Sequence, residues 1–447
     1  FQFEANDFTA LSGSVISTNT IAETTATSGV TIDGLLIKDS TAAFADGAVA
    51  TPSITNTGDV NTGIYFPAAD TVGVVTGGVE QFRYGSNPVT SKNLVINGGC
   101  TVAQRGTQTG QGTAHARTAV DMFHLRVESG EQSRYTTSQD TGLSVANSVL
   151  TGGHRTALKI DCTTAEVSVA AGERQLILTS IEAQNLQHLE YGAASAKTLS
   201  LSFGISSPKS GTHCVALYQT DGDRHYIMEF TVASANTFER IKIEGIPGDT
   251  GGTINNDNDK GLWIAFPLIA GSNWQNTADT WANGEDYATS NQQNLLDNTS
   301  NNIWITGLQL EVGSVATDFE HEGFGVTYLK CKRYLPFYFD AANNSNFRFA
   351  FGAAYSTSYF QCILPFLVPP RAAVTISVDS IGNWRAETGD GTGIVVTAIA
   401  TQPGVNADNF GMWSAANFQS SSGYTAKEPG FLRPNGTSGI MIASCEI

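Results

Sequence analysis

Apolar and polar residues alternate over several short stretches of the chain. The clearest lies around residue 310, where Leu308, Leu310 and Val312 alternate with Gln309 and Glu311. A period of two predicts a strand with one face buried and the other exposed to solvent. We therefore expect a half-buried strand here, in which the two polar side chains make scaffold contacts and do not bind a ligand.

The same period predicts further strands over residues 198–205, 226–232 and 241–243. Residues 262–269 are apolar at almost every position, which indicates a central sandwich strand, and Pro267 predicts that this strand bulges or ends there. One short helix is expected over 180–189, with Ser180 as its N-cap and Glu182 in its first turn. Short strands separated by turn residues are typical of an all-β sandwich or jelly roll.

The two ends of the chain differ from this middle region. Residues 1–92 contain only short apolar runs between Thr, Ser, Gly and Asp, and such runs cannot bury a core unless several copies intertwine. The C-terminal part predicts strands at 347–351, 359–364 and 374–378 and a docked final strand at 440–447. We therefore divide the chain into three parts, 1–92, 93–325 and 326–447.

Composition supports a folded, β-rich protein and limits its partners. Hydrophobic residues make up 41% and charged residues only 15% of the 447 residues, and 46 glycines favour turns. The formal net charge is −17 and no run of Lys or Arg is present, so we expect no nucleic-acid partner. No apolar run is long enough to cross a bilayer, so we expect no membrane insertion.

The cysteines show no C-x-x-C pair and no metal-finger spacing. In a protein assembled in a reducing cytoplasm they would serve as small buried hydrophobes, although the count alone leaves disulfides open. The six are Cys100, Cys162, Cys214, Cys331, Cys362 and Cys445.

Several stretches of the middle region resemble the jelly-roll domain of bacteriophage tail fibres. Residues 93–106 read Asn-Leu-Val-Ile-Asn-Gly-Gly-Cys-Thr-Val-Ala-Gln-Arg-Gly and resemble its opening, which is followed by an Asp at position 121. Residues 304–320 resemble its closing strand, which also resembles that of some carbohydrate-binding modules. The Cys-x-Arg-Tyr element at 331–334 commonly follows this domain and is expected here to link it to the next one.

The two ends of the chain resemble the same phage proteins. Residues 21–39, 51–65 and 72–83 resemble repeats of fibre shafts, and residues 364–378 resemble the C-terminal domain. The resemblance implies an elongated all-β homotrimer with an intertwined N-terminal β shaft, a central jelly-roll β-sandwich and a C-terminal β-domain. It implies a virion protein on the exterior of the phage, with other phage tail or head proteins and a host surface glycan or protein receptor as partners.

The sequence offers little that points to catalysis. No G-x-S-x-G turn and no H-E-x-x-H pair is present. Acidic neighbours such as Asp221 and Asp223 are interpreted as turn residues and not as a glycosidase pair. We therefore expect a binding protein and not an enzyme. Three alternatives stay open: a capsid fibre or decoration protein, a tailspike enzyme that degrades surface polysaccharide, and a carbohydrate-binding module of a cellular protein.

Tryptophans in polar, loop-like stretches are the candidate ligand-binding residues, because exposed aromatic faces stack on sugar rings. Trp274 and Trp281 lie in such a stretch of the jelly roll, and Trp384 and Trp413 lie in the terminal part. The alternative for the terminal pair is packing against a neighbouring protomer.

The loop at 255–259, Asn-Asn-Asp-Asn-Asp, is rich in oxygen ligands of the kind that Ca²⁺ prefers. Asp257 and Asp259 are therefore the candidate metal ligands for a structural Ca²⁺. The loop lacks the Gly and Glu of an EF-hand, so a solvated turn is the preferred interpretation, and no other cofactor is expected.

Overall fold

A computed structural model describes residues 44–69, 71–84, 92–128, 133–150, 152–340, 348, 350–389, 393–400, 413–420, 423–436 and 439–446. The chain forms two compact units, Phe1–Thr90 and Ser91–Ile447, and each is described by itself. The predicted fibre repeat at 21–39 lies outside the described residues. The described part is all-β with a few short helices, as predicted.

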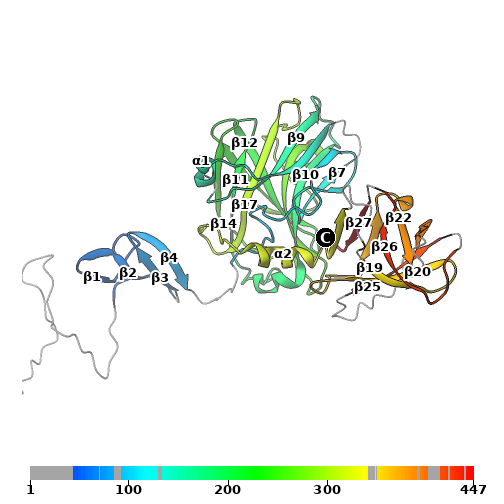
Figure 1. Ribbon diagram of the computed structural model, residues 1–447. Helices are drawn as coiled ribbons and strands as arrows, with labels where there is room; N and C mark the ends of the chain where they lie inside the picture. Colours follow the sequence, from blue (N-terminus) through cyan, green and yellow to red (C-terminus); the bar gives the residue numbers. More distant parts are fainter. Residues whose placement is uncertain are drawn as a thin grey trace, which may run out of the picture. The chain divides into compact units, whose positions relative to one another are not determined.

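The described part of the first unit contains one antiparallel sheet with the strand order β1-β2-β3-β4 (Figure 1). Its strands are Ile54–Asn56, Asp59–Ala68, Thr71–Thr76 and Val79–Tyr84. Ile54 pairs with Ile64, and Ile64 pairs with Val74, so these three residues share one face. Ile54 and Ile64 are 41% and 36% exposed, whereas Tyr65 on the other face is 3% exposed. One face of this sheet therefore carries an exposed apolar stripe.

Two antiparallel sheets of the second unit form a β-sandwich (Figure 1). The six-stranded sheet has the order β14-β11-β17-β9-β8-β5, with bounds Phe238–Ile246, Leu199–Ser206, Asn302–Val312, Ala157–Thr164, Arg134–Asp140 and Gln108–Gln111. The seven-stranded sheet has the order β16-β13-β12-β15-β10-β7-β6, with bounds Trp281–Asn283, Arg224–Val232, Gly211–Gln219, Lys260–Ala270, Arg174–Glu182, Phe123–Val127 and Ala116–Arg117. Apolar side chains from both sheets form one continuous core between them.

The strands that the alternating pattern predicted are present as β11, β13 and β14. The central strand β15 is buried on both faces, as its composition indicated. Its pairing with β10 shifts at Pro267, because Gln175 lies opposite Ile269 while the next residue, Leu176, lies opposite Pro267. The predicted bulge at this proline is therefore confirmed.

Strand β17 differs from its prediction in one respect. Leu308 and Leu310 belong to the core, as the alternation required, but Gln309 is 0% and Glu311 only 3% exposed. The strand is buried on both faces and is not half-buried, because residues 316–320 return across its polar face. The Glu311 and Gln309 side chains accept hydrogen bonds from the backbone N–H groups of Thr317 and Glu320 in that segment.

The helix expected over 180–189 is shorter than predicted. Strand β10 continues to Glu182, and a 3-10 helix, η1, covers Ala183–Leu189. Ser180 is therefore a strand residue opposite Trp263 and caps no helix. The strand pairing supplies backbone hydrogen bonds that a capped helix would have to replace. Leu186 is buried against the sandwich, as expected.

The C-terminal part of the second unit contains two more sheets. The order β18-β27-β21 joins Phe337–Asp340, Ile440–Ser444 and Thr375–Val378, so the final strand is docked as predicted. The order β23-β22-β26-β19-β20-β25-β24 joins Gly393–Val395, Trp384–Thr388, Pro429–Pro434, Ala350–Ala354, Tyr359–Pro365, Trp413–Gln419 and Ala398–Ala400. A separate apolar core lies within this part.

Short helices complete the second unit. They are α1 at Val145–Leu150, η2 at Ser272–Trp274, α2 at Phe324–Lys332 and η3 at Ile381–Asn383. No helix among the described residues is long and apolar enough to span a membrane. The predicted boundary at 325/326 falls inside α2, whose Cys331 packs with Val102 and Met122 of the sandwich. The division into three parts stays a prediction.

Candidate functional site

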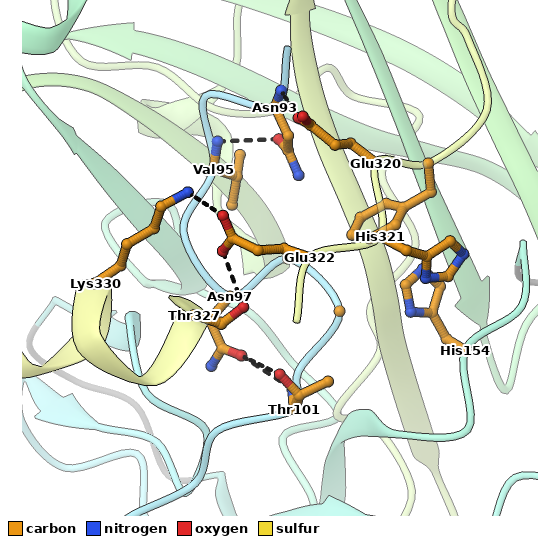
Figure 2. Close-up of a pocket in the computed structure, with 13 residues that line it drawn as sticks. Asn93, Val95, Asn97, Thr101, His154, Glu320, His321, Glu322, Thr327 and Lys330 are labelled. Carbon is orange, nitrogen blue, oxygen red and sulfur yellow. Dashed lines mark hydrogen bonds and ion pairs between the residues drawn. The ribbon is translucent and has the colours of Figure 1, made fainter. Parts of the chain in front are cut away.

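The candidate site is a polar hollow where the first and last segments of the sandwich meet helix α2 (Figure 2). It encloses about 470 Å³, counting the space continuous with solvent. Its lining residues are Asn93, Val95, Asn97, Gly98, Gly99, Thr101, His154, Phe319, Glu320, His321, Glu322, Thr327 and Lys330. We call it the end pocket.

The opening segment of the end pocket is shaped by Asn97. This residue has a φ of 60°, in the left-handed region that Asn tolerates better than most residues. Its side-chain oxygen accepts hydrogen bonds from the backbone N–H groups of Thr101 (2.9 Å) and Val102 (3.0 Å). Its amide nitrogen donates to the carbonyl oxygens of Val102 and Asp121, both at 2.9 Å. The Asn-Gly-Gly turn is therefore fixed by one buried side chain.

The closing segment is held on strand β17. The Glu311 carboxylate accepts hydrogen bonds from the backbone N–H of Thr317 (2.8 Å) and from its hydroxyl (2.7 Å). Gln309 accepts one from the N–H of Glu320 (2.7 Å). Glu320 then accepts a hydrogen bond from the N–H of Asn93 (2.8 Å), which joins the last segment to the first (Figure 2). The predicted scaffold role of Gln309 and Glu311 is confirmed.

Two imidazoles and one aromatic ring form one side of the end pocket. The ring of His154 lies edge-on to Phe319 at 4.2 Å between centroids and 5.0 Å from the ring of His321. Burial, with smaller contributions from the nearby His321 and Arg240, lowers the pKa of His154 to about 3. His154 is therefore a neutral imidazole near pH 7.

Helix α2 supplies the opposite side. The Glu322 carboxylate accepts a hydrogen bond from the Thr327 hydroxyl (3.0 Å) and pairs with the Lys330 ammonium at 2.5 Å (Figure 2). Figure 2 shows both α2 side chains directed toward Glu322. Amides, carboxylates, imidazoles, a hydroxyl and an ammonium thus converge on one hollow. This set can donate and accept hydrogen bonds with a polar, hydroxyl-bearing molecule.

The motif residues of the opening and of the Cys-x-Arg-Tyr element lie together in a structural joint. Gln104 donates to Asp121 through its backbone N–H (2.9 Å) and its amide. The buried Glu182 carboxylate pairs with two nitrogens of Arg333, Nη2 (2.6 Å) and Nε (3.0 Å), and accepts a hydrogen bond from the Tyr334 hydroxyl (2.9 Å). These side chains bind other parts of the chain, so a structural role accounts for them.

Two further contacts complete this joint. The Arg105 guanidinium pairs with the Glu446 carboxylate, which lies just beyond strand β27. The N–H of Cys445 donates to the carbonyl oxygen of Tyr334 at 2.9 Å. The Cys-x-Arg-Tyr element therefore joins the sandwich, through Glu182, to the residues that follow the final strand, through Cys445.

The two jelly-roll tryptophans that we singled out do not line the end pocket. Trp274 lies against the Arg174 guanidinium, 3.6 Å from the ring centroid, and donates to the Gly172 carbonyl oxygen. Trp281 packs edge-on against Tyr191 and donates to the Pro247 carbonyl oxygen. Both rings thus make contacts within the protein, and their binding of a sugar stays a prediction.

The two tryptophans of the terminal part lie on different strands. Trp384, at the start of β22, is 0% exposed and belongs to the C-terminal core, so its ring is not on the surface. Trp413 is the first residue of β25 and pairs with Pro365. The structure does not bring these two together with Trp274 or Trp281 in the end pocket.

The oxygen-rich loop at 255–259 is engaged by other parts of the chain. Asp257 accepts the N–H of Asp259 (2.9 Å), and Asp259 lies 3.9 Å from the Arg371 guanidinium. Asn258 donates to the Arg371 carbonyl oxygen at 2.5 Å. Within the described ranges, no group of three or more His, Cys, Asp or Glu side chains is arranged to hold a metal ion. Asp257 and Asp259 form a turn that contacts Arg371.

The six cysteines are all free and buried. Burial raises the pKa of the Cys100 thiol to about 12 and that of Cys162 to about 11. They serve as small buried side chains.

Comparison with known proteins finds similarity only at the level of solved structures. No protein-family model and no curated protein matches the chain. A family 11 carbohydrate-binding module from Clostridium thermocellum, in complex with a mixed-linked tetrasaccharide, matches at 14% identity, with a TM-score of 0.22, over 47% of this chain and 99% of its own. A putative sugar binding protein from Bacteroides thetaiotaomicron matches at 12% identity, with a TM-score of 0.27, over 49% of this chain and 100% of its own.

A phage protein also appears among the similar structures. The enzymatically active domain of tailspike protein 4 from bacteriophage CBA120 matches at 10% identity, with a TM-score of 0.21, over 49% of this chain but only 21% of its own. The neighbours are mainly carbohydrate-binding modules. At such identities and TM-scores, these matches do not assign a ligand or an activity to this chain.

Sequence reasoning missed most residues of the end pocket. His154, Glu320, Glu322 and Lys330 come from three separate segments and share no local motif. The available signal was the resemblance of both the opening and closing stretches to one domain. It implies that the two stretches are the ends of one unit, and the ends of a domain often lie close together.

Proposed function

We propose that the chain is a subunit of a homotrimeric bacteriophage tail fibre, on the exterior of the virion, and that its jelly roll binds a host surface glycan without cleaving it. Binding of a single glycan is weak, and three copies on a fibre would multiply it through effective concentration. The fibre and phage parts of the proposal rest on the sequence resemblance.

The observation that carries the glycan proposal is the lining of the end pocket. Glu320 and Glu322 offer acceptors, Lys330 offers donors, and Phe319 offers an apolar ring beside them. Sugars present hydroxyls that both donate and accept beside apolar C–H faces, so this mixture suits them. The pocket opens to solvent, which an extended surface polymer requires.

The same lining supports binding without cleavage. Hydrolysis of a glycosidic bond uses a pair of carboxyl groups, and both carboxylates of the pocket are engaged by the chain itself, Glu320 by the N–H of Asn93 at 2.8 Å. The Glu322 carboxylate is paired with Lys330. These features favour a binding site over a hydrolytic one.

A glycan array with the full chain would test the function, followed by titration of the best ligand. Lys330→Ala and His321→Ala should each weaken that binding several-fold, because each side chain removes one polar partner from the pocket. Lys209→Ala is the matched control, since Lys209 pairs with Asp297 in the same way but lies outside the end pocket. Equal affinity of all variants would contradict the proposed site.

Two further measurements separate the alternatives. Electron microscopy of intact particles labelled with antibody against this chain would place it on the tail, as we expect, or on the capsid as a fibre or decoration protein. Incubation with host polysaccharide should leave the polymer intact, whereas released oligosaccharide would indicate a tailspike enzyme.

A further inference from the structure

A second set of polar side chains lies on the seven-stranded sheet, on the face turned away from the sandwich core. On β7, Phe123 and Leu125 point into the core, so His124 between them points to the other face. On β15, Ile264 is a core residue, and the neighbouring Trp263 belongs to the separate cluster on the outer face. This outer face is distinct from the end pocket.

Strand register brings these outer-face residues side by side. Ser180 lies opposite Trp263, and His124 lies opposite Leu178, which is two residues from Ser180 on the same face of β10. Arg117 on β6 lies opposite His124. Three adjacent strands therefore present an imidazole, a hydroxyl and an indole within one small area.

Cations surround this area. The Arg126 guanidinium lies 4.9 Å and the Lys260 ammonium 5.3 Å from the Trp263 ring centroid. Burial lowers the pKa of His124 well below its usual range, and the nearby Arg117, Lys260 and Arg126 charges lower it further. Burial likewise lowers the pKa of Lys260, with Arg126, Arg117 and Arg371 adding to the shift and Asp259 opposing it.

Carboxylates compensate these cations only in part. Arg126 lies 2.9 Å from Glu285 and 3.9 Å from Glu128, and both carboxylates also pair with Arg174. Glu446 lies 3.7 Å from Arg117 but also pairs with Arg105. Lys260 forms no ion pair with any residue in the described part of the chain. Positive charge is therefore in excess here, although the whole chain carries −17.

Buried polar atoms in the same area lack partners within the described ranges. They are the indole Nε1 of Trp263, the hydroxyl of Ser180, the Nε of Arg126 and the Nδ1 of His124. Trp263 is 4% and Ser180 5% exposed, so both are more than nine-tenths buried. Three of these four groups are donors, and a buried donor without an acceptor costs free energy.

We infer that the outer face around Trp263 is an oxyanion-binding site, at which Lys260 and Arg126 pair with a carboxylate or phosphate group and the Trp263 and Ser180 donors complete its hydrogen bonds. The carrier of that group is an acidic saccharide, a part of the inference that rests on the proposed function. Local cations are needed because the net negative charge of the chain repels anions at long range.

Titration of the full chain at low and moderate salt tests the site with three probes: trigalacturonate, inorganic phosphate and neutral maltotriose. The wild type should bind trigalacturonate, more weakly as salt rises, and should not bind maltotriose at this site. Lys260→Gln and Arg126→Gln should each weaken trigalacturonate binding roughly tenfold, because each removes one charge-assisted contact. Ser180→Ala should weaken trigalacturonate binding less. Because this substitution is small, correct folding of the variant is simple to check.

Lys159→Gln is the matched control, because Lys159 also lies near a tryptophan ring, 5.4 Å from that of Trp304. It should leave binding unchanged. Unaltered affinity in folded Lys260→Gln and Arg126→Gln, or an equal loss in Lys159→Gln, would overturn the site. Phosphate binding that Lys260→Gln removes, without trigalacturonate binding, would support the oxyanion site and reject the saccharide carrier. That result would not bear on the glycan site proposed for the end pocket, because that proposal is tested with different variants.

Discussion

Single buried polar residues determine how the ends of the sandwich are built. Asn97 fixes the opening turn with four hydrogen bonds, and Glu311 holds the returning segment at Thr317. Each bond adds a modest net free energy, but leaving such a buried group unpaired costs more. His154 is another buried polar residue at this end of the sandwich, since it is 5% exposed and its imidazole is neutral near pH 7.

His154 predicts a pH dependence of stability. Its folded-state pKa of about 3 lies below the ordinary value of about 6.5, so the unfolded chain takes up the proton first as pH falls. The stability that the neutral His154 imidazole contributes is fully present above about pH 6.5. As the pH falls toward 3, the free energy of unfolding decreases by at most about 1.4 kcal/mol per pH unit. Urea unfolding at several pH values should show a flatter profile for His154→Gln than for the wild type.

The exposed His188 on η1 provides the comparison for this measurement. Burial also lowers the pKa of His188, but its side chain is exposed to solvent, so His188→Gln should flatten the profile less than His154→Gln. Identical profiles for His154→Gln and the wild type would show that burial of the imidazole does not contribute to acid sensitivity.

The sequence predicted Gln309 and Glu311 as polar positions of a strand but not as buried ones. Alternation reports which side chains share a face, and the segment that covers a face comes from elsewhere in the chain. The end pocket was missed for the same reason, because His154 and Lys330 meet only through the fold. In contrast, the bulge at Pro267 was predictable, since proline acts on its own strand.

At the scale of elements, the end of β10 is decisive for the link between the sandwich and the C-terminal part. Sequence placed Glu182 in the first turn of a helix, where a carboxylate is favourable. In the structure it ends the strand, is 1% exposed and pairs with Arg333 and Tyr334. A distant bidentate partner thus outweighs local helix preference.

Glu182→Ala should destabilise the chain by about 3–5 kcal/mol, because it leaves Arg333 beside a buried site without its partner. Denaturant unfolding measures the change. Glu322→Ala removes a more exposed ion pair with Lys330 and should cost less than about 1 kcal/mol. A Glu182→Ala cost as small as that of Glu322→Ala would mean that the pair does not hold the link together.

At the scale of the whole molecule, the apolar stripe of the β1–β4 sheet needs a covering surface. Ile54 and Ile64 stay exposed on a sheet that buries few apolar residues of its own. Such a sheet is marginal alone and is stabilised when another copy covers it. The expected trimer of the proposed fibre would supply that copy.

Size-exclusion chromatography with light scattering should show three chains per particle at micromolar concentration. Ile64→Asp should reduce this mass toward that of one chain, because a carboxylate in an apolar contact is costly to bury. Val315→Asp is the control, since Val315 is also exposed, at 49%, but lies in the other unit. A wild type that elutes as a clean monomer would refute the trimer.

The hydrogen bond between Asn93 and Glu320 has a consequence for how such a chain can evolve. The first and last segments of the sandwich lie side by side. Recombination can therefore replace the whole sandwich as one cassette without displacing the sequences that flank it. A replacement cassette must keep a carboxylate equivalent to Glu182, because Arg333 downstream would otherwise lose its partner. Such an exchange is therefore constrained where the sandwich meets the C-terminal part, at Glu182 with Arg333 and at Arg105 with Glu446.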